Sequence, residues 1–277
     1  MGKSIVVTSG KGGVGKTTIV GNIGVGLASL GKSVALIDVD IGLRNLDLVL
    51  GLENRIVYNI MDVIEGNCKL SQALVKDKRF KDNLVLLPAA QTRLKEEVKI
   101  EDLKLIVNEL KKKYDFVILD SPAGIEHGFR MSSLSSDEAI VVTTPEITSI
   151  RDADRVIGLL ESMEIFEPSL IINRVRIDMV KKGEMLHWND IEEILSIKVI
   201  GIIPEDPYIT ISTNIGEPAI LNDNSIGGKE LKNVVRRILG EDVPLVIYQE
   251  KTSFIDKLSG LFKREKKWVY LKQKKVD

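Results

Sequence analysis

The chain has 277 residues, of which 44% are hydrophobic, and a formal net charge of −1, values typical of a soluble globular protein that can bury a core. Its single cysteine, Cys68, excludes an intrachain disulfide and any metal or iron–sulfur site built from cysteine pairs of one chain. No stretch approaches the ~20 apolar residues of a membrane-spanning helix. Residues 1–5 lead directly into the first apolar run, which leaves no room for a signal or transit peptide, so we expect a cytoplasmic protein.

Short apolar, β-branched runs alternate with segments of helical periodicity along most of the chain. In chain order, strands are predicted at residues 4–8, 33–38, 84–87, 116–120, 139–143, 169–173 and 198–203, and helices near 17–30, 99–113, 151–162, 189–195 and 229–239. Such apolar runs suit strands buried on both faces, so the alternation predicts an α/β fold with a mostly parallel sheet covered by helices on both faces. Because no composition break precedes about residue 245, we predict a single domain, residues 1–245, followed by a tail, residues 246–277.

The segment that joins the first strand to the first helix matches the phosphate-loop pattern G-x-x-x-x-G-K-[ST], with the residues Gly10-Lys11-Gly12-Gly13-Val14-Gly15-Lys16-Thr17. Its glycines let successive backbone N–H groups turn toward phosphate oxygens, which a Cβ would obstruct. We expect Lys16 to place its charge between the β- and γ-phosphates and Thr17 to offer its hydroxyl to Mg²⁺. The following helix, which includes Thr18, points its positive end at the same phosphates. The pattern therefore predicts a single-domain P-loop NTPase.

Aspartates follow two other predicted strands, at the edge where ligands of such sheets bind. Asp38 and Asp40 follow the second strand, and Asp120 ends the strand at 116–120. Taken alone, an aspartate after a strand is commonly a turn or helix-cap residue. Two such sites beside a phosphate loop favour a different role, in which the carboxylates accept Mg²⁺ or its waters. We predict that Asp38 and Asp120 lie at the metal together with Thr17.

Two further strand ends are candidates for binding a nucleobase. Asn173 and Arg174 end one strand, and an asparagine amide can both donate to and accept from an adenine edge. Pro204, Glu205 and Asp206 end another strand in a stiff turn that exposes backbone polar groups. Asparagine and proline also commonly end strands for structural reasons, so the residues alone leave both interpretations open.

Residues 9–18, with Lys11 ahead of Lys16, resemble the deviant Walker A loop of the ParA/MinD ATPases. The resemblance is closest to the septum-positioning branch of that family and covers the chain to about residue 264. It extends over the two switch segments and two later strand ends, at residues 38–47, 120–126, 144–155 and 173–174.

The resemblance implies an ATPase that uses ATP and Mg²⁺, with Lys11, Lys16 and Asp40 as its catalytic residues. Lys11 would reach across a dimer interface to the partner's nucleotide, in the manner of an arginine finger. Lys16 would hold the phosphates, and Asp40 would position the attacking water. Thr17 and, through water, Asp120 would hold Mg²⁺. The other implied nucleotide contacts are the loop residues Gly10, Gly12, Gly13, Val14, Gly15 and Thr18 and the adenine-site residues Asn173, Arg174, Pro204, Glu205 and Asp206.

Within the tail, residues 251–277 carry nine basic and three acidic side chains, a net charge of +6 that leaves −7 on residues 1–250. At ~100° per residue, five bulky apolar side chains fall within roughly 120° of a helix: Phe254, Ile255, Leu258, Leu261 and Phe262. A terminal helix docked on its own domain would show such a stripe, whereas the basic flank favours an interfacial helix on anionic lipid. The resemblance also implies a membrane-binding tail. Residues 266–277 continue past the family's usual ending, either as extra interfacial anchoring or as an unfolded basic segment.

The resemblance further implies that the protein dimerises on ATP, binds the inner face of the cell membrane and recruits a MinC-like inhibitor of the division ring to place the septum. It implies a topological factor as well, either a MinE-like activator or a polar scaffold. Partner contacts are expected near residues 151–155, although an ordinary solvated helix start explains those residues equally well.

The main alternative is a ParA-type DNA-partition ATPase, which would need a basic surface that follows the phosphates. Here the body is acidic and the basic residues accompany an apolar stripe, so we expect no specific nucleic acid. The iron–sulfur relatives of the family need cysteine pairs, which a chain with one cysteine does not have. The tyrosine-kinase relatives would end in a tyrosine cluster, whereas only Tyr248 and Tyr270 lie near this end. A metabolic ATP-using enzyme would need a second group of polar residues for an acceptor substrate, and none is evident.

Overall fold

The structure is a computed structural model that describes residues 1–92 and 98–245. The chain divides into two units, residues 1–245 and 246–277, and all the described residues belong to the first. The predicted membrane-binding tail, with its stripe of apolar side chains, lies outside the described residues. The assignment of separate roles to the two parts of the chain therefore stays a prediction.

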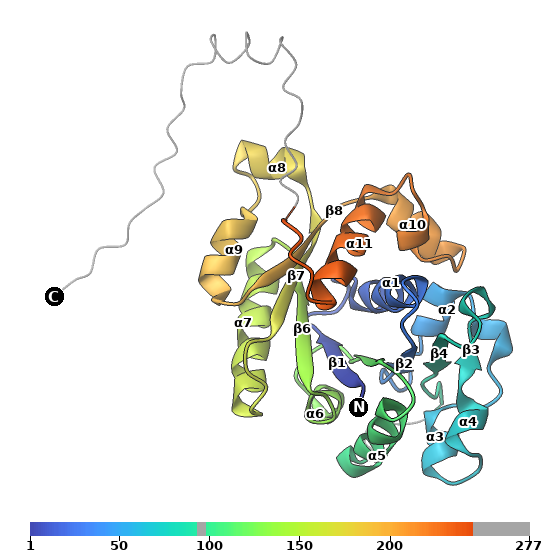
Figure 1. Ribbon diagram of the computed structural model, residues 1–277. Coiled ribbons are helices and arrows are strands. Elements are labelled where there is room, and N and C mark those ends of the chain that lie inside the picture. Colours follow the sequence, from blue (N-terminus) through green and yellow to red (C-terminus); the bar gives the residue numbers. More distant parts are fainter. Residues whose placement is uncertain (93–97, 246–277) are drawn as a thin grey trace, which may run out of the picture. The chain divides into compact units, whose positions relative to one another are not determined.

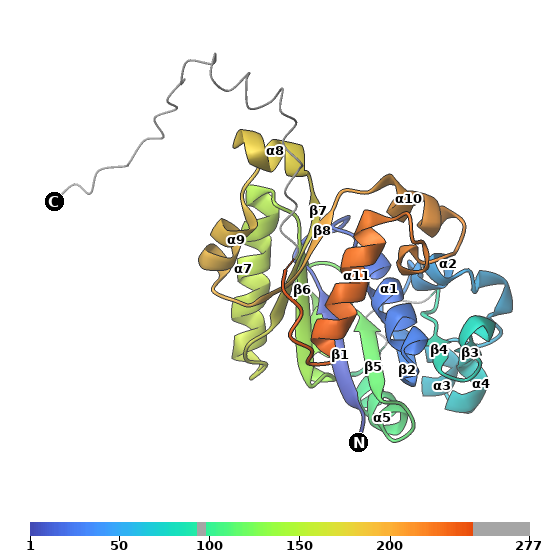
Figure 2. The same ribbon diagram turned by 45° about the horizontal axis from the view of Figure 1, so that its top comes forward.

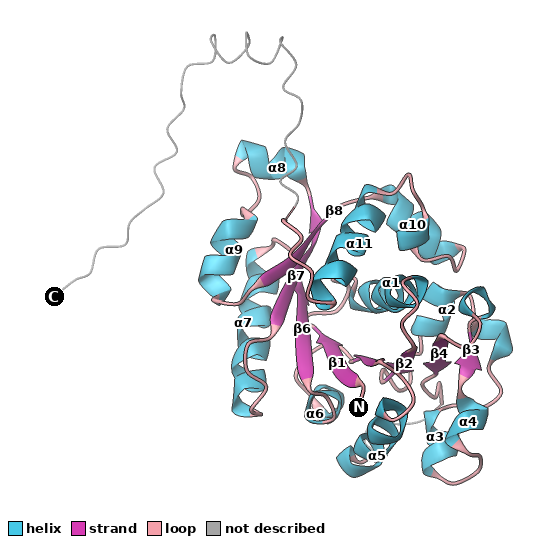
Figure 3. Ribbon diagram, viewed as in Figure 1, coloured by secondary structure: helices cyan, strands magenta, loops and turns pink. Residues whose placement is uncertain are grey.

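An eight-stranded sheet runs through the first unit in the order β3-β4-β2-β5-β1-β6-β7-β8 (Figure 1, Figure 3). The strands are β1 (Lys3–Thr8), β2 (Val34–Asp38), β3 (Val75–Lys76), β4 (Leu84–Leu87), β5 (Phe116–Asp120), β6 (Glu138–Thr143), β7 (Ser169–Val175) and β8 (Val199–Pro204). Every neighbouring pair is parallel except β3 with β4. The predicted α/β fold with a mostly parallel sheet is confirmed, and every predicted strand is present to within two residues.

Helices cover both faces of this sheet, as predicted (Figure 2). One face is covered by α1 (Lys16–Ser29), α2 (Leu46–Leu50) and α11 (Ile226–Ile238). The other face is covered by α3 (Ile60–Ile64), α4 (Leu70–Ala73), α5 (Ile100–Lys111), α6 (His127–Leu134), α7 (Ile147–Ser162) and α9 (Trp188–Leu195). Successive strand side chains point to opposite faces, so Ile5 and Val7 of β1 join the first core and Val6 joins the second.

Several short elements were not predicted from the sequence. They are β3, α2, α3, α4, α6, α8 (Ile177–Lys182), α10 (Pro207–Asn214) and the 3-10 turns η1 (Glu53–Arg55), η2 (Lys78–Phe80) and η4 (Ala219–Leu221). All of these except α6 and α10 have at most six residues, too few for a periodic signal. Among the described helices, none is both long enough and apolar enough to cross a bilayer.

The sheet places the phosphate-loop pattern at a switch in the strand order. β1 lies between β5 and β6, and the chain builds the β2 side of the sheet before it crosses to the β6 side. Open parallel sheets bind ligands beyond the carboxyl ends of the strands at such a point. We therefore expect a ligand-binding site at the loop after β1 and the ends of β2, β5, β7 and β8.

Candidate functional site

The loop between β1 and α1 has the geometry of an anion-binding loop. Gly13 and Gly15 have φ angles of 79° and 92°, left-handed values at which a side chain would be strained. Gly15 is also the N-cap of α1, so no N-cap side chain accepts a hydrogen bond from the first turn of this helix. The first N–H groups of a helix have no intrahelical partner, so this uncapped turn, which contains Lys16, Thr17 and Thr18, presents donors and the positive end of the helix dipole to a ligand.

Two neighbouring segments pack against this loop. A Cβ on Gly10 would lie 2.4 Å from the carbonyl oxygen of Asp152 in α7, so the approach of the helix depends on glycine at this position. On the other side, the Gly124 N–H donates to the carbonyl oxygen of Ser9 at 3.0 Å. The segment after β5, which resembles a second switch, is thus joined directly to the phosphate loop.

Lys16 and Asp120 form a buried ion pair, with Nζ 2.6 Å from Oδ1. The two side chains are only 7% and 1% exposed. The other carboxylate oxygen, Asp120 Oδ2, is buried and has no hydrogen-bond partner among the described residues. A buried acceptor left unsatisfied is costly, so this oxygen would be stabilised by a cation or by a water bound to one. The fold has brought the predicted phosphate lysine and a predicted metal carboxylate together across 104 residues of sequence.

Asp38 lies beside Asp120 because β2 and β5 pair these two residues in register. Its Oδ1 accepts the Asp40 N–H at 3.0 Å, and its Oδ2 accepts the N–H groups of Asn45 and Leu46 at 3.1 and 3.2 Å. Burial, and secondly the charge of Asp120, raise the pKa of Asp38 to about 7 against the effect of these hydrogen bonds. Asp38 therefore organises the segment after β2, which resembles a first switch and on which Asp40 is half-buried. The metal contact of Asp38 and the water-positioning role of Asp40 stay predictions.

Lys11 lies apart from the Lys16–Asp120 pair, at the exposed rim of the site. Its side chain is 46% exposed, and its Nζ is 3.5 Å from both Glu146 Oε2 and Thr148 Oγ1 at the start of α7. An exposed and long ion pair of this kind contributes little free energy. Lys11 can therefore leave it at small cost to reach another anion.

The residues at the site suit a Mg²⁺ ion that is held jointly with a ligand. Within residues 1–92 and 98–245, no group of three or more His, Cys, Asp and Glu side chains is placed to hold a metal by itself. Mg²⁺ commonly binds through one or two carboxylates plus phosphate oxygens and water. Thr17 and Asp120, with its unpartnered Oδ2, fit such a set.

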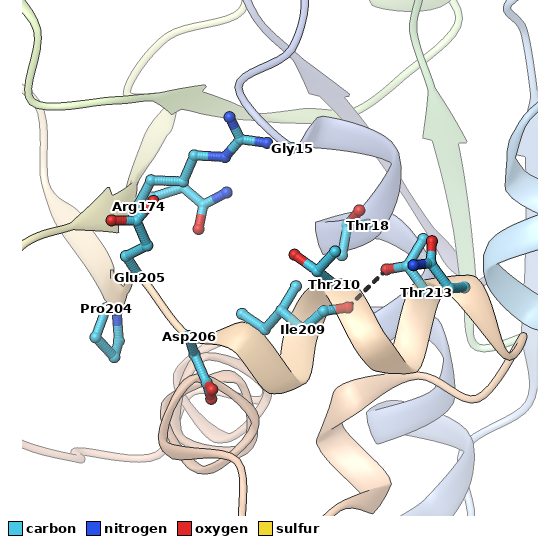
Figure 4. A pocket seen from close by; sticks show the side chains of 11 residues that line it. Gly15, Thr18, Arg174, Pro204, Glu205, Asp206, Ile209, Thr210 and Thr213 are labelled. Carbon is cyan, nitrogen blue, oxygen red and sulfur yellow. Dashed lines mark hydrogen bonds between the residues drawn. The ribbon is translucent and has the colours of Figure 1, made fainter.

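A pocket of about 410 Å³ opens beside the loop (Figure 4). Gly15 and Thr18 line it on the loop side. In Figure 4, Arg174, Pro204 and Glu205 lie on one side and Thr18, Thr210 and Thr213 on the other. Its volume is in the range of small-ligand sites. The predicted phosphate loop and the predicted base-binding strand ends are thus walls of a single pocket.

Two of the predicted base contacts make other bonds in the structure. Asn173 is 6% exposed, and its Nδ2 donates to the carbonyl oxygen of Val14 at 2.7 Å. Asp206 caps α10 by accepting the Tyr208 N–H at 2.9 Å and joins it to α11 by accepting from Ser225 Oγ and the Gly227 N–H at 2.6 and 3.0 Å. These three bonds fix the Asp206 carboxylate in a structural role between α10 and α11.

The sequence interpretation missed one wall of this pocket, which α10 supplies through Ile209, Thr210, Thr213 and Asn214. One signal for this helix was present in the sequence. An aspartate followed by proline, as at Asp206 and Pro207, is typical of a helix N-cap and first helical position.

Comparison with known proteins identifies the family. The AAA domain family matches residues 2–171. The septum site-determining protein MinD of Bacillus subtilis is 53% identical over 252 residues, which cover 91% of this chain and 94% of that protein. MinD of Thermotoga maritima is 51% identical over 271 residues, which cover 96% of this chain and 100% of that protein.

Solved structures give the same answer. The MinC:MinD cell division complex of Aquifex aeolicus matches with a TM-score of 0.83 and 51% identity over 89% of this chain and 100% of that chain. MinD of Pyrococcus horikoshii, complexed with Mg-ADP, matches with a TM-score of 0.78 and 29% identity over 88% and 100%. A ParA family ATPase of Chlorobium tepidum, with a TM-score of 0.72 and 22% identity over 85% and 99%, shares the fold alone. Together with the phosphate loop and its second lysine, these matches show that the chain belongs to the MinD family of septum site-determining, cell-division ATPases.

Proposed function

We propose that this protein is a Mg²⁺-dependent ATPase that is active as an ATP-bound dimer and positions the division septum from the inner face of the cell membrane. The observation that carries the proposal is the uncapped start of α1 behind the left-handed Gly13 and Gly15, with Lys16 buried next to it and Lys11 at its rim. Phosphoryl transfer depends mainly on positioning and charge neutralisation, which this set of donors and cations supplies. The Mg-ADP bound to the Pyrococcus horikoshii relative supports the same ligand here.

In the proposed site, the loop N–H groups and Lys16 bind the phosphates, and Thr17 and Asp120 hold Mg²⁺, which neutralises phosphate charge when bound. Binding of a triphosphate offers Lys16 a new anionic partner, so its bond to Asp120 Oδ1 would be exchanged for phosphate contacts. That exchange frees the Asp120 carboxylate for the ion or its waters. Asp40, held by the Asp38 carboxylate, positions the attacking water.

Lys11 is proposed to complete the site of a second copy. Its exposed position and its weak contact with Glu146 leave it available to an anion brought by a partner. Lys11→Ala should preserve folding but abolish ATP-dependent dimerisation, measured by light scattering, and ATP hydrolysis. Lys3→Ala is the matched control, because Lys3 is equally exposed at the other end of β1 and pairs with the exposed Glu138. Normal turnover by the Lys11 variant would remove this lysine from the mechanism.

Membrane attachment is proposed to come from the tail, through Phe254, Ile255, Leu258, Leu261 and Phe262. Each fully buried apolar side chain contributes about 1.5–3 kcal/mol, but ordering the helix offsets much of that sum. A single tail would bind weakly, whereas two tails on an ATP-held dimer gain effective concentration. The nucleotide state would then set the time that the protein spends on the membrane.

The proposed partners are a MinC-like division inhibitor and a topological factor that is either a MinE-like activator or a polar scaffold. The MinC:MinD complex of Aquifex aeolicus supports the first of these. The start of α7, around residues 151–155, is the proposed contact region. The proposed location is cytoplasmic, with peripheral attachment to the inner membrane face.

The deciding experiment is co-sedimentation with anionic liposomes in ATP and in ADP, with duplex DNA as a parallel ligand. We expect sedimentation only with ATP and liposomes, and its loss in Leu261→Glu. Ser259→Glu is the matched control, because it adds the same charge off the apolar stripe. ATP-dependent binding to DNA but not to liposomes would instead support the partition ATPase.

A further inference from the structure

The end of β7 is irregular at the point where it meets the pocket. Its pairing with β8 shifts between Ile172 and Val175, and Arg174 adopts a left-handed φ of 57°. A non-glycine residue in this conformation costs about 1–3 kcal/mol, so it persists only where the surrounding structure enforces it. Bulges of this kind re-aim side chains next to active sites. Here the result is that Asn173 is buried while Arg174 is exposed.

The buried Asn173 amide contacts the phosphate loop itself. Its Nδ2 donates to the Val14 carbonyl oxygen at 2.7 Å, and a Cβ on Gly15 would lie 2.4 Å from the same nitrogen. The amide is therefore packed against the Val14–Gly15 peptide. Because the Val14 oxygen can only accept, the NH₂ group must face it, and a flipped amide would oppose two oxygens.

Without Asn173 the Val14 carbonyl would lose its partner in a buried position. The first carbonyl that accepts an α1 bond is that of Gly15, which receives the Ile19 N–H at 3.0 Å, so the Val14 oxygen lies outside the helix ladder. Val14 itself is 3% exposed. A buried backbone acceptor is normally paired, and an orphaned one is costly. The orientation of this peptide also fixes the direction in which the Gly15 N–H points.

We propose that Asn173 is a positioning residue of the phosphate loop: it holds the Val14–Gly15 peptide so that the loop N–H groups converge on the phosphates. This proposal rests on the proposed nucleotide binding and differs from the adenine contact that the sequence resemblance implied. One amide N–H is committed to Val14, while the second N–H and the amide oxygen keep their own hydrogen-bonding capacity. An effect of Asn173 that acts through the loop must therefore appear with a ligand that has phosphates and no base.

Inorganic tripolyphosphate separates the two roles, because it has the phosphates of ATP and no base. Affinities for ATP and for tripolyphosphate are measured by displacement of a fluorescent ATP analogue from the full chain. We expect Asn173→Ala to weaken both by a similar factor, about tenfold for one orphaned buried acceptor. Thr210→Ala, on the opposite wall, should change the affinity for ATP but not for tripolyphosphate.

If Asn173→Ala loses affinity for ATP while tripolyphosphate binds as in the wild type, Asn173 acts on the base and the inference is refuted. A wild-type chain that binds no ATP would refute the proposed function and the inference with it. Hydrogen exchange of residues 10–18 without ligand gives a second readout, which should be faster in Asn173→Ala and unchanged in Thr210→Ala. Asn173→Ser, whose hydroxyl is too short to reach Val14, repeats the test if the alanine variant does not fold.

Discussion

Replacing Arg237 by methionine should destabilise the protein far more than the same replacement of its neighbour Arg236. Arg237 Nη1 lies 2.7 Å from Glu230 Oε1, and the two side chains are 7% and 1% exposed. Removing one partner of a buried pair leaves an uncompensated charge and costs about 3–5 kcal/mol. Arg236 pairs with Glu241 at the surface, with both side chains nearly half exposed, so its loss should cost no more than about 1 kcal/mol.

Further bonds of the same guanidinium add to this cost. Nη1 also donates to the carbonyl oxygen of Ile200 in β8, and Nε and Nη2 donate to those of Val243 and Pro244, at 2.8, 2.9 and 2.7 Å. Arg237 thus ties α11 to an edge strand and to the segment just before the predicted tail. Methionine keeps a similar apolar stem but supplies none of these donors.

Urea unfolding of the full chain measures these differences as changes in the free energy of unfolding at constant slope. The double variant Arg237→Met/Glu230→Met removes the unpaired charge as well, so it should recover the part of the loss that comes from that charge, while the bonds to the Ile200, Val243 and Pro244 carbonyls stay lost. The reasoning is refuted if Arg237→Met is within about 1 kcal/mol of Arg236→Met. A double variant as unstable as the sum of its two single variants would refute it equally.

Two further changes test the packing and the electrostatics of the first unit. Burial raises the pKa of Asp38 from 3.8 to about 7, so between these values the native state keeps a proton that the unfolded chain releases. The contribution of Asp38 to the free energy of unfolding is therefore full below about pH 4 and is lost as the pH rises through about 7. Asp38→Asn should flatten the fall in unfolding free energy between about pH 4 and 7, and an unchanged slope would contradict the assigned shift. Gly51→Ala should lower the melting temperature more than Gly66→Ala. Both glycines have positive φ, but only at Gly51 would a Cβ meet backbone, 2.8 Å from the Gly216 oxygen. Equal shifts in melting temperature would show that only the backbone strain at positive φ matters.

The sequence by itself determined the features that depend on neighbouring residues. The phosphate loop was readable because its left-handed glycines and the lysine that follows act within one turn of backbone. The strands were readable because strands buried on both faces need continuous apolar runs. The long helices were readable from their period, although α7 begins four residues before its predicted start, directly after the turn at Pro145 and Glu146.

Only the tertiary structure decided which distant groups meet. The strand order, which places β5 between β1 and β2, brings Asp120 to Lys16 and to Asp38. The end of β7 places Asn173 at the Val14 carbonyl, a contact across 159 residues that no local pattern encodes. The short helix α10 completes the pocket, although its eight residues gave no periodic signal. Local patterns fix backbone conformation, whereas the partner of each buried polar group depends on how the strands and helices pack together.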